Sequence, residues 1–200
     1  MNEPSLDAPS PPEWGQTQVP AGIRFRRFLG EVVQTILIAG LLFLAVNLLT
    51  ARIRVEGISM EPNLHEGQFV IVSRLAYRWE LPERGDIVVF RFPLNPDRRF
   101  IKRVIGLPGD SISIQAGTVV VNGEQLNEPY LAVTPRYSGE WTLSNDDVFV
   151  LGDNRNNSSD SQNWGPLPLE NIIGKAFLIY WPPTEAGVIP HYDIATASTN

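Results

Sequence analysis

An uncharged apolar run is the feature that most constrains how this chain can fold. Residues 32–51 read VVQTILIAGLLFLAVNLLTA. A helix rises ~1.5 Å per residue, so this run spans ~30 Å, the thickness of the hydrocarbon core of a bilayer. A cleavable secretory signal has a shorter apolar run and a small-residue exit, and the following NLLTARI offers no such exit. The run therefore predicts a retained transmembrane anchor at residues 23–51.

The basic residues on either side of this run predict its orientation. Arg24, Arg26 and Arg27 precede it, whereas Arg52 and Arg54 follow it. Cytoplasmic flanks of membrane helices carry the larger number of basic residues. We therefore expect a single-pass protein with a cytoplasmic N-terminus, whose residues from 52 onward lie on the extracytoplasmic side.

Composition excludes several classes of function. The chain has no cysteine, which excludes disulfides, thiol catalysis and thiolate metal sites. Its net charge of −6 provides no basic field for nucleic acid, so no nucleic-acid partner is expected. The two histidines, His65 and His191, are far apart in sequence, and neither a metal nor a cofactor is expected.

The remainder predicts one β-rich domain at residues 52–183, between a disordered tail at 1–22 and a flexible tail at 184–200. Both tails are rich in polar residues and lack an apolar period. Between them, short apolar stretches alternate with polar residues or are bounded by turn residues, as strands do. The Asn122-Gly123 pair predicts a tight hairpin. The expected strand segments are 52–57, 68–77, 85–93, 98–110, 110–126, 146–154 and 174–183.

Ser59 is the candidate nucleophile in the segment EGISMEPNLHEGQ, residues 56–68. A serine between Gly57 and Pro62 is also ordinary turn chemistry. A serine hydroxyl is inert at neutral pH and needs a base beside it. His65 is close in sequence, although its surroundings are typical of a solvated turn. A lysine whose pKa is lowered by burial is the other candidate base.

Lys102 is the better placed of the two lysines in the chain. If its segment is a strand, alternation puts Lys102 on one face with Phe100 and Val104, and Arg103 on the other. A lysine among apolar side chains either extends its ammonium to water or loses the proton. Lys175 is a weaker candidate because it lies at the start of its strand.

A third polar segment, LGDNRNNSSDSQNWGPLP, occupies residues 151–168 after an apolar strand. A calcium loop built on Asp153 and Asn157 is excluded, since Arg155 puts a cation where an oxygen ligand is needed. The segment is either a polar turn or a loop that orients neighbouring side chains.

These blocks occur in a specific order along the chain: SMEP, GDIVVFRFP, FIKRVIGLPGD and GDNRNNSSDS, beginning at residues 59, 85, 100 and 152. With the anchor, they resemble bacterial type I signal peptidases over residues 25–182. The resemblance implies an all-β, partly barrel-like catalytic domain on one N-terminal transmembrane helix, with an apolar surface facing the membrane. It implies an endopeptidase of the cytoplasmic (inner) membrane that cleaves N-terminal signal peptides from exported preproteins after small residues. Its expected partners are those signal peptides and the lipid bilayer.

The resemblance also assigns roles to residues. Ser59 is implied to be the nucleophile and Lys102 its general base, and Ser158 is implied to orient the lysine. Backbone groups at Gly57 and Ser59 are implied to stabilise the oxyanion. The residues implied to support the site are Met60, Arg103, Asp153, Asn154, Arg155 and Asp160.

Two positions depart from the family pattern. Some members have Ser or Thr where this chain has Gly57, so backbone N–H groups are expected to do more of the oxyanion stabilisation. Many members have an arginine that pairs with Asp160 where this chain has Gln162, which leaves the partner of Asp160 open.

Two alternative functions remain open at this point. One is a self-cleaving repressor-type peptidase, which shares the Ser/Lys chemistry and β fold but carries a DNA-binding module in place of an apolar helix. The other is a membrane-tethered β domain that binds partners without catalysis.

Overall fold

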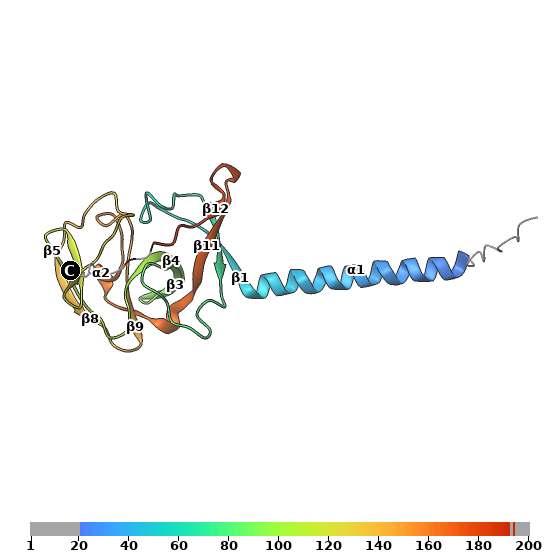
Figure 1. Ribbon diagram of the computed structural model, residues 1–200, viewed down its shortest axis with the longest axis horizontal. Helices are drawn as coiled ribbons and strands as arrows, with labels where there is room; N and C mark the ends of the chain where they lie inside the picture. The colour runs from blue at the N-terminus through green and yellow to red at the C-terminus, as the bar shows by residue number, and fades with distance from the viewer. Residues whose placement is uncertain (1–20, 193, 195–200) are drawn as a thin grey trace, which may run out of the picture. The chain divides into compact units, whose positions relative to one another are not determined.

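The computed structural model describes residues 21–192 and residue 194, and the side chains from residue 26 onward (Figure 1). The expected tail at residues 1–22 lies almost wholly outside this part of the chain, as do residues 193 and 195–200. The chain divides into two units, Met1–Leu44 and Ala45–Asn200.

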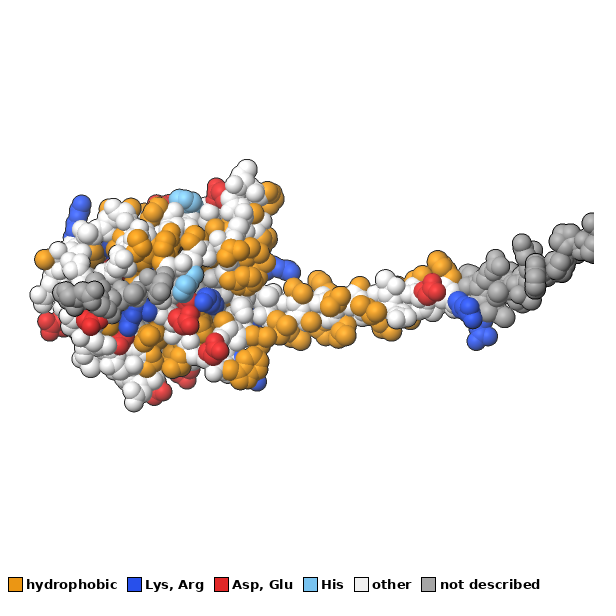
Figure 2. Space-filling view, viewed as in Figure 1, with side chains coloured by type: hydrophobic (Ala, Val, Ile, Leu, Met, Phe, Trp, Pro, Cys, Tyr) orange, Lys and Arg blue, Asp and Glu red, His pale blue; other side chains and the backbone are white. Residues whose placement is uncertain are grey.

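The described part of the first unit is helix α1, Ala21–Leu49, which runs on into the second unit. Its segment Arg26–Leu49 is long and apolar enough to cross a membrane, and the most apolar stretch within it has a mean hydropathy of 2.4. None of its most apolar stretch is buried against protein, and hydrophobic side chains cover most of its surface (Figure 2). A helix that is apolar all round and unpacked fits a lipid environment. It ends at Leu49, slightly before the expected limit of the anchor.

The second unit is built almost entirely of strands. Its elements in chain order are β1 Thr50–Arg54, β2 Phe69–Ser73, β3 Ile87–Phe92, β4 Asn95–Gly106, β5 Ser111–Gln115, β6 Thr118–Val121, β7 Glu124–Gln125, β8 Gly139–Thr142, β9 Asp147–Leu151, α2 Ser161–Trp164, β10 Leu167–Pro168, η1 Leu169–Asn171, β11 Ile172–Trp181, η2 Pro183–Glu185 and β12 Gly187–Val188.

The strands form two antiparallel sheets. The larger has the order β1-β2-β11-β3-β4-β9-β10, with β12 added beside β11, and the smaller has the order β7-β6-β5-β8. This confirms the predicted all-β class. The Asn122-Gly123 turn joins β6 to β7 as expected, with Asn122 at a φ of 54°. Sequence reasoning missed β8, β10 and β12, which are too short to show an apolar period.

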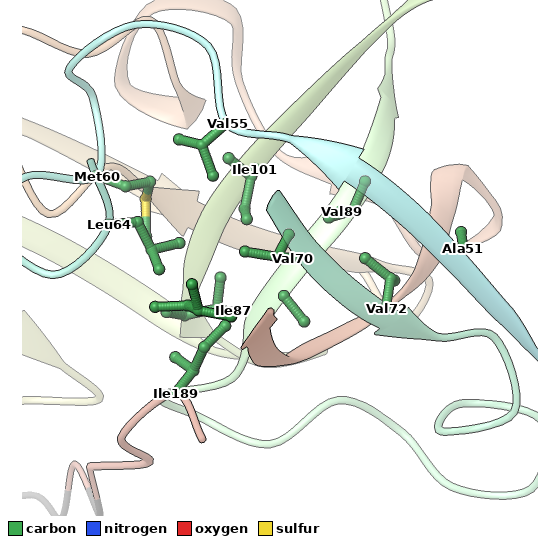
Figure 3. Close-up of a cluster of buried hydrophobic side chains, with 12 residues drawn as sticks. Ala51, Val55, Met60, Leu64, Val70, Val72, Ile87, Val89, Ile101 and Ile189 are labelled. Atoms are coloured by element: carbon green, nitrogen blue, oxygen red, sulfur yellow. The ribbon is translucent and has the colours of Figure 1, made fainter. Parts of the chain in front are cut away.

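Three buried clusters hold the second unit together, and the first of them supports the segment around Ser59. It joins Val55, Met60 and Leu64, which follow β1, to Val70 and Ile101 on the sheet (Figure 3). A second cluster packs against the smaller sheet and includes side chains of its strands β5 and β6. A third lies under β3, β4 and β9.

The ordered domain continues past the boundary expected at residue 183. Strand β12 pairs with β11, where Val188 lies opposite Leu178. Ile189 is buried in the first cluster and Ile194 in the second. The described part of the expected flexible tail is therefore packed, because isolated apolar side chains anchor a stretch that has no period of its own.

We expect Ile194→Ala to lower the free energy of unfolding by about 2–4 kcal/mol, because it removes a buried side chain from the second cluster. Urea unfolding of the detergent-solubilised protein, followed by tryptophan fluorescence, measures this change. Val188→Ala is the matched control, since Val188 is 77% exposed and its truncation leaves no cavity. Equal stability of the two variants would show that residue 194 does not belong to the core.

Candidate active site

Ser59 and Lys102 meet although they lie on different elements. Ser59 is in the turn that follows β1, and Lys102 is in the middle of β4. Lys102 Nζ lies 2.7 Å from Ser59 Oγ and donates a second hydrogen bond, of 2.9 Å, to the carbonyl oxygen of Ile101. The His65 side chain is 54% exposed and lies 4.0 Å from Glu61. The structure therefore places the lysine, and not the histidine, against the serine.

The Ser59 turn is held from two sides. On the inner side, Met60 is fully buried in the first cluster beside Leu64 (Figure 3). On the outer side, Asn154 donates from its backbone N–H to the carbonyl oxygen of Ser59 at 3.0 Å, and from its side chain to that of Ile58 at 3.2 Å. The hydroxyl is therefore fixed by packing on one flank and by the polar loop on the other.

The environment of Lys102 favours its neutral form. Lys102 is 4% exposed, and its Nζ lies 5.5 Å from the centroid of the Phe100 ring. Burial lowers the pKa of this amine from 10.5 to about 8, while the carboxylates of Asp160 and Asp153 act in the opposite direction. The strand alternation predicted from the sequence thus explains why the lysine is on an apolar face.

Asp160 has backbone partners in place of an arginine. Its carboxylate accepts hydrogen bonds from the N–H of Gly152 at 2.9 Å and of Gln162 at 3.3 Å, and it caps α2. The Gln162 side chain donates to the carbonyl oxygen of Arg155. Burial raises the pKa of Asp160, while the Gly152 N–H, the Ser158 hydroxyl and Lys102 hold it down.

Ser158 lies at the site but does not bond to the lysine in this structure. Its Oγ is buried and has no hydrogen-bond partner among the residues that the structure describes, although it is near enough to Asp160 to influence that carboxyl. Gly152 packs tightly here, since a Cβ on it would come within 2.5 Å of the Ser59 carbonyl oxygen and would also overlap Ser158. The lysine-orienting role of Ser158 stays a prediction.

Arg103 points to the opposite face of β4 from Lys102. It makes two hydrogen bonds to Asp153, at 2.8 and 2.7 Å, and both side chains are fully buried. Its third bond, of 2.9 Å, is to the carbonyl oxygen of Gly85, and its guanidinium lies 4.1 Å from the centroid of the Tyr130 ring. Asn63 also donates to Asp153, at 2.9 Å. The ion pair connects β4 to the loop that holds Ser59.

A second buried ion pair braces the same loop. Arg155 donates to Glu128 at 2.8 and 2.5 Å and to the carbonyl oxygen of Gly152 at 3.2 Å. Sequence reasoning missed Glu128, Tyr130 and Asn63 as partners of this loop, because no spacing in the sequence relates them to it.

Gly57 has a φ of 75°, a left-handed conformation that glycine adopts without the strain of a side chain. A Cβ would meet no atom within 4 Å there, so the backbone conformation and not lack of space favours glycine. The N–H of Ser59 donates to no acceptor in the described part of the chain.

A cleft of about 600 Å³ opens beside Ser59 and Lys102, between β1 and the first half of β4. Among the described residues both walls are strand edges without a partner, since β1 pairs only with β2 there and β4 pairs with β9 only from Arg103 to Gly106. The cleft can therefore accept an extended chain that pairs with both edges.

One group of possible metal ligands lies away from this site, among the described residues. Oxygen or nitrogen atoms of Glu83, Asp86 and His191 come within 4.8 Å of one another. Lys175 Nζ lies 2.5 Å from Asp86, so an ammonium ion already balances the buried carboxylate.

Comparison with known proteins gives consistent matches. The family described as signal peptidase, peptidase S26, matches residues 29–181. A probable signal peptidase I-2 of Synechocystis sp. is 40% identical over 166 residues, which cover 80% of this chain and 76% of that protein. Signal peptidase I of Leptolyngbya laminosa is 40% identical over 168 residues, covering 80% and 83%. Thylakoidal processing peptidase 1 of Arabidopsis thaliana is 36% identical over 148 residues, covering 68% and 44%.

We expect Asp153→Asn to lower the free energy of unfolding by about 3–5 kcal/mol, because it leaves the buried Arg103 guanidinium without a counter-charge. Chemical denaturation of the purified protein measures this loss. Asp146→Asn is the control, as Asp146 is exposed and its carboxylate makes no ion pair in the described part of the chain. A similar small effect in both variants would contradict a structural role for the ion pair.

Proposed function

The chain belongs to the peptidase S26 family of signal peptidases, and we propose that Ser59 and Lys102 form the catalytic dyad of a membrane-bound endopeptidase. The observation that carries this proposal is the 2.7 Å contact between Ser59 Oγ and the buried Lys102 Nζ. The proposed substrates are exported preproteins, cut after small residues at the end of the signal peptide.

In the first half of the reaction, neutral Lys102 takes the Ser59 proton as Oγ attacks the scissile carbonyl carbon. The carbon–nitrogen bond then breaks, and Lys102 returns the proton to the leaving amine. The signal peptide remains bound to Ser59 Oγ as an ester.

In the second half, Lys102 takes a proton from a water molecule, whose oxygen attacks the ester carbonyl. The ester bond breaks, Ser59 Oγ regains a proton from Lys102, and the signal peptide leaves with a new carboxyl group, which releases its proton to the solvent. Lys102 is thus neutral at the start of each half-reaction, which its burial favours.

The oxyanion formed in both halves needs donors that are already in place. The N–H of Ser59 is the proposed donor, because it has no acceptor among the described residues and its turn is fixed by Met60 and Asn154. One such donor is typically worth a factor of ~10²–10³ in rate. Gly57, with its unhindered left-handed backbone, lets the chain turn into this position.

The proposed substrate lies as an added strand in the cleft between β1 and β4. Unpaired backbone groups on both edges supply hydrogen bonds to any extended sequence, which suits an enzyme that cuts many preproteins. Selection of small side chains next to the scissile bond is then left to the part of the cleft beside Ser59 and Lys102.

We place the protein in the cytoplasmic membrane through α1, with its N-terminus in the cytoplasm and the β domain outside. Helix α1 leads directly into β1, and Ser59 follows Thr50 by at most ~30 Å of chain. The nucleophile therefore stays near the membrane surface at which a signal peptide emerges. The relatives include a thylakoidal enzyme, so fractionation of cell membranes tests this placement.

We expect Ser59→Ala and Lys102→Ala each to abolish cleavage of a secretory precursor by the detergent-solubilised protein, because each removes one half of the dyad. The fall in rate is expected to exceed ~10³-fold, the scale of a lost nucleophile or base. Denaturing gel electrophoresis of the precursor and its processed product measures the rate, and circular dichroism confirms that the variants are folded. His65→Ala is the control and is expected to retain activity. Cleavage that survives Lys102→Ala but fails in His65→Ala would refute the dyad.

We expect kcat/KM to rise with pH through about 8, the lowered pKa of Lys102, and to level off above it. Only the neutral amine accepts a proton, and its fraction grows as pH passes the pKa. A peptide-cleavage assay from pH 6 to 10 measures the profile.

Asp160→Asn provides the matched variant for this profile. The Asp160 carboxylate raises the pKa of Lys102, so its neutralisation is expected to move the midpoint to lower pH. A rate that is flat between pH 6 and 9 would contradict a titrating lysine.

A further inference from the structure

The cleft beside the dyad carries a concentration of positive charge on an acidic chain. Its lining includes arginines from both walls, which we call the groove arginines: Arg52, Arg54, Arg98 and Arg99. All are exposed, and the acidic residues that share the lining are Glu56 and Asp97. The chain as a whole has a net charge of −6, so this basic cleft is a local feature and not a reflection of composition.

The groove arginines are not held in ion pairs within the described part of the chain, although Glu56 and Asp97 share the cleft lining. None of them makes an ion pair there, and Arg98 instead lies with its guanidinium 5.1 Å from the centroid of the Phe100 ring. Arg99 occupies the position on β4 directly opposite Arg91 on β3. Like charges opposite each other on neighbouring strands are destabilising, so this arrangement costs stability that an anionic ligand would restore.

The position of the groove arginines identifies which ligand they meet. They line the same cleft as Ser59 and Lys102, so a molecule bound between them occupies the path of the substrate. A lipid headgroup held there would obstruct the peptide, whereas a side chain of the peptide itself would be bound productively. Arg98, Arg99 and Lys102 all lie on β4, where a strand rise of ~3.3 Å per residue puts Arg99 about 10 Å and Arg98 about 13 Å along the strand from Lys102.

We propose that the groove arginines select substrates with an acidic side chain about three to five residues from the scissile bond. This inference rests on the proposed function of the Ser59–Lys102 site. An extended substrate has the same rise as the strands beside it, so this spacing brings a carboxylate level with the guanidinium groups. Arginine binds a carboxylate through two parallel hydrogen bonds.

The selection acts on binding and not on the chemical step. The groove arginines are too far from the reacting atoms to stabilise the transition state, and a basic cleft raises the local concentration of acidic peptides. An acidic residue is therefore expected to lower KM and leave kcat unchanged. Exposed ion pairs are individually weak, so the expected gain in kcat/KM is about three- to fivefold at low salt.

The experiment uses the full-length protein in a neutral detergent and a series of synthetic peptides with alanine at the first and third positions before the cut. Each peptide carries Asp, Gln or Lys at one test position. The test positions are those three to five residues from the cut, on its N-terminal side in one set of peptides and on its C-terminal side in another. The enzyme variants are Arg99→Gln, Arg98→Glu with Arg99→Glu, and the control Arg136→Gln, since Arg136 is exposed and lies outside the cleft lining. Kinetics at 50 mM and 500 mM NaCl separate electrostatic from other effects.

The proposal is supported if one Asp peptide has a lower KM than its Gln and Lys counterparts, if 500 mM NaCl removes the difference, and if the double Glu variant prefers the Lys peptide. It is overturned if the Asp, Gln and Lys peptides are cut equally, or if the arginine variants cut all the peptides more slowly by the same factor. The same kinetics are also measured in phosphatidylglycerol vesicles, and the proposal is overturned if the arginine variants lose only a stimulation by this lipid, which would assign the arginines to lipid. Failure to cut the Gln peptide at all would instead refute the proposed function.

Discussion

Lys102 is 4% exposed and its amine touches a serine hydroxyl, so the amine has lost most of the hydration that an ammonium ion holds in water. Burial lowers the pKa of Lys102 from 10.5 to about 8, which at ~1.4 kcal/mol per pKa unit corresponds to about 3 kcal/mol of unfavourable ammonium burial. That is a large share of the ~5–15 kcal/mol by which a domain of this kind is stable. The surrounding structure must therefore be rigid enough to keep the amine from reaching solvent.

Strand β4 supplies that rigidity because one of its faces carries the lysine and the other carries a buried ion pair. Lys102 lies on the face with Phe100, and the next residue, Arg103, lies on the other face and pairs with Asp153. Asn154 follows Asp153 in sequence and bonds to the carbonyl oxygen of Ser59. One ion pair thus fixes the strand that carries the proposed base to the loop that holds the proposed nucleophile. Replacement of the pair by apolar side chains could preserve stability, but it would lose this directional link.

The sequence could predict the position of a residue where a regular period of the strand or helix determines it. The alternation along β4 predicted the faces of Lys102 and Arg103, because a strand has a period of two whatever surrounds it. The length and polarity of residues 32–51 predicted α1 for a similar reason. Contacts made by loops were not predictable, as in the pairing of Arg155 with Glu128. The loops bring together side chains whose separation in sequence has no regular relation to distance.

The partner of Asp160 shows how one such loop contact bears on the proposed chemistry. In many signal peptidases an arginine two residues on pairs with the residue that corresponds to Asp160, whereas this chain has Gln162 there. Backbone N–H groups satisfy the hydrogen bonds of the Asp160 carboxylate, but they carry no full positive charge to neutralise it. The carboxylate therefore acts on Lys102 and raises its pKa against the effect of burial. In this chain the Asp160 carboxylate, without an arginine at position 162 beside it, thus shifts the pH range in which the proposed base is neutral upward.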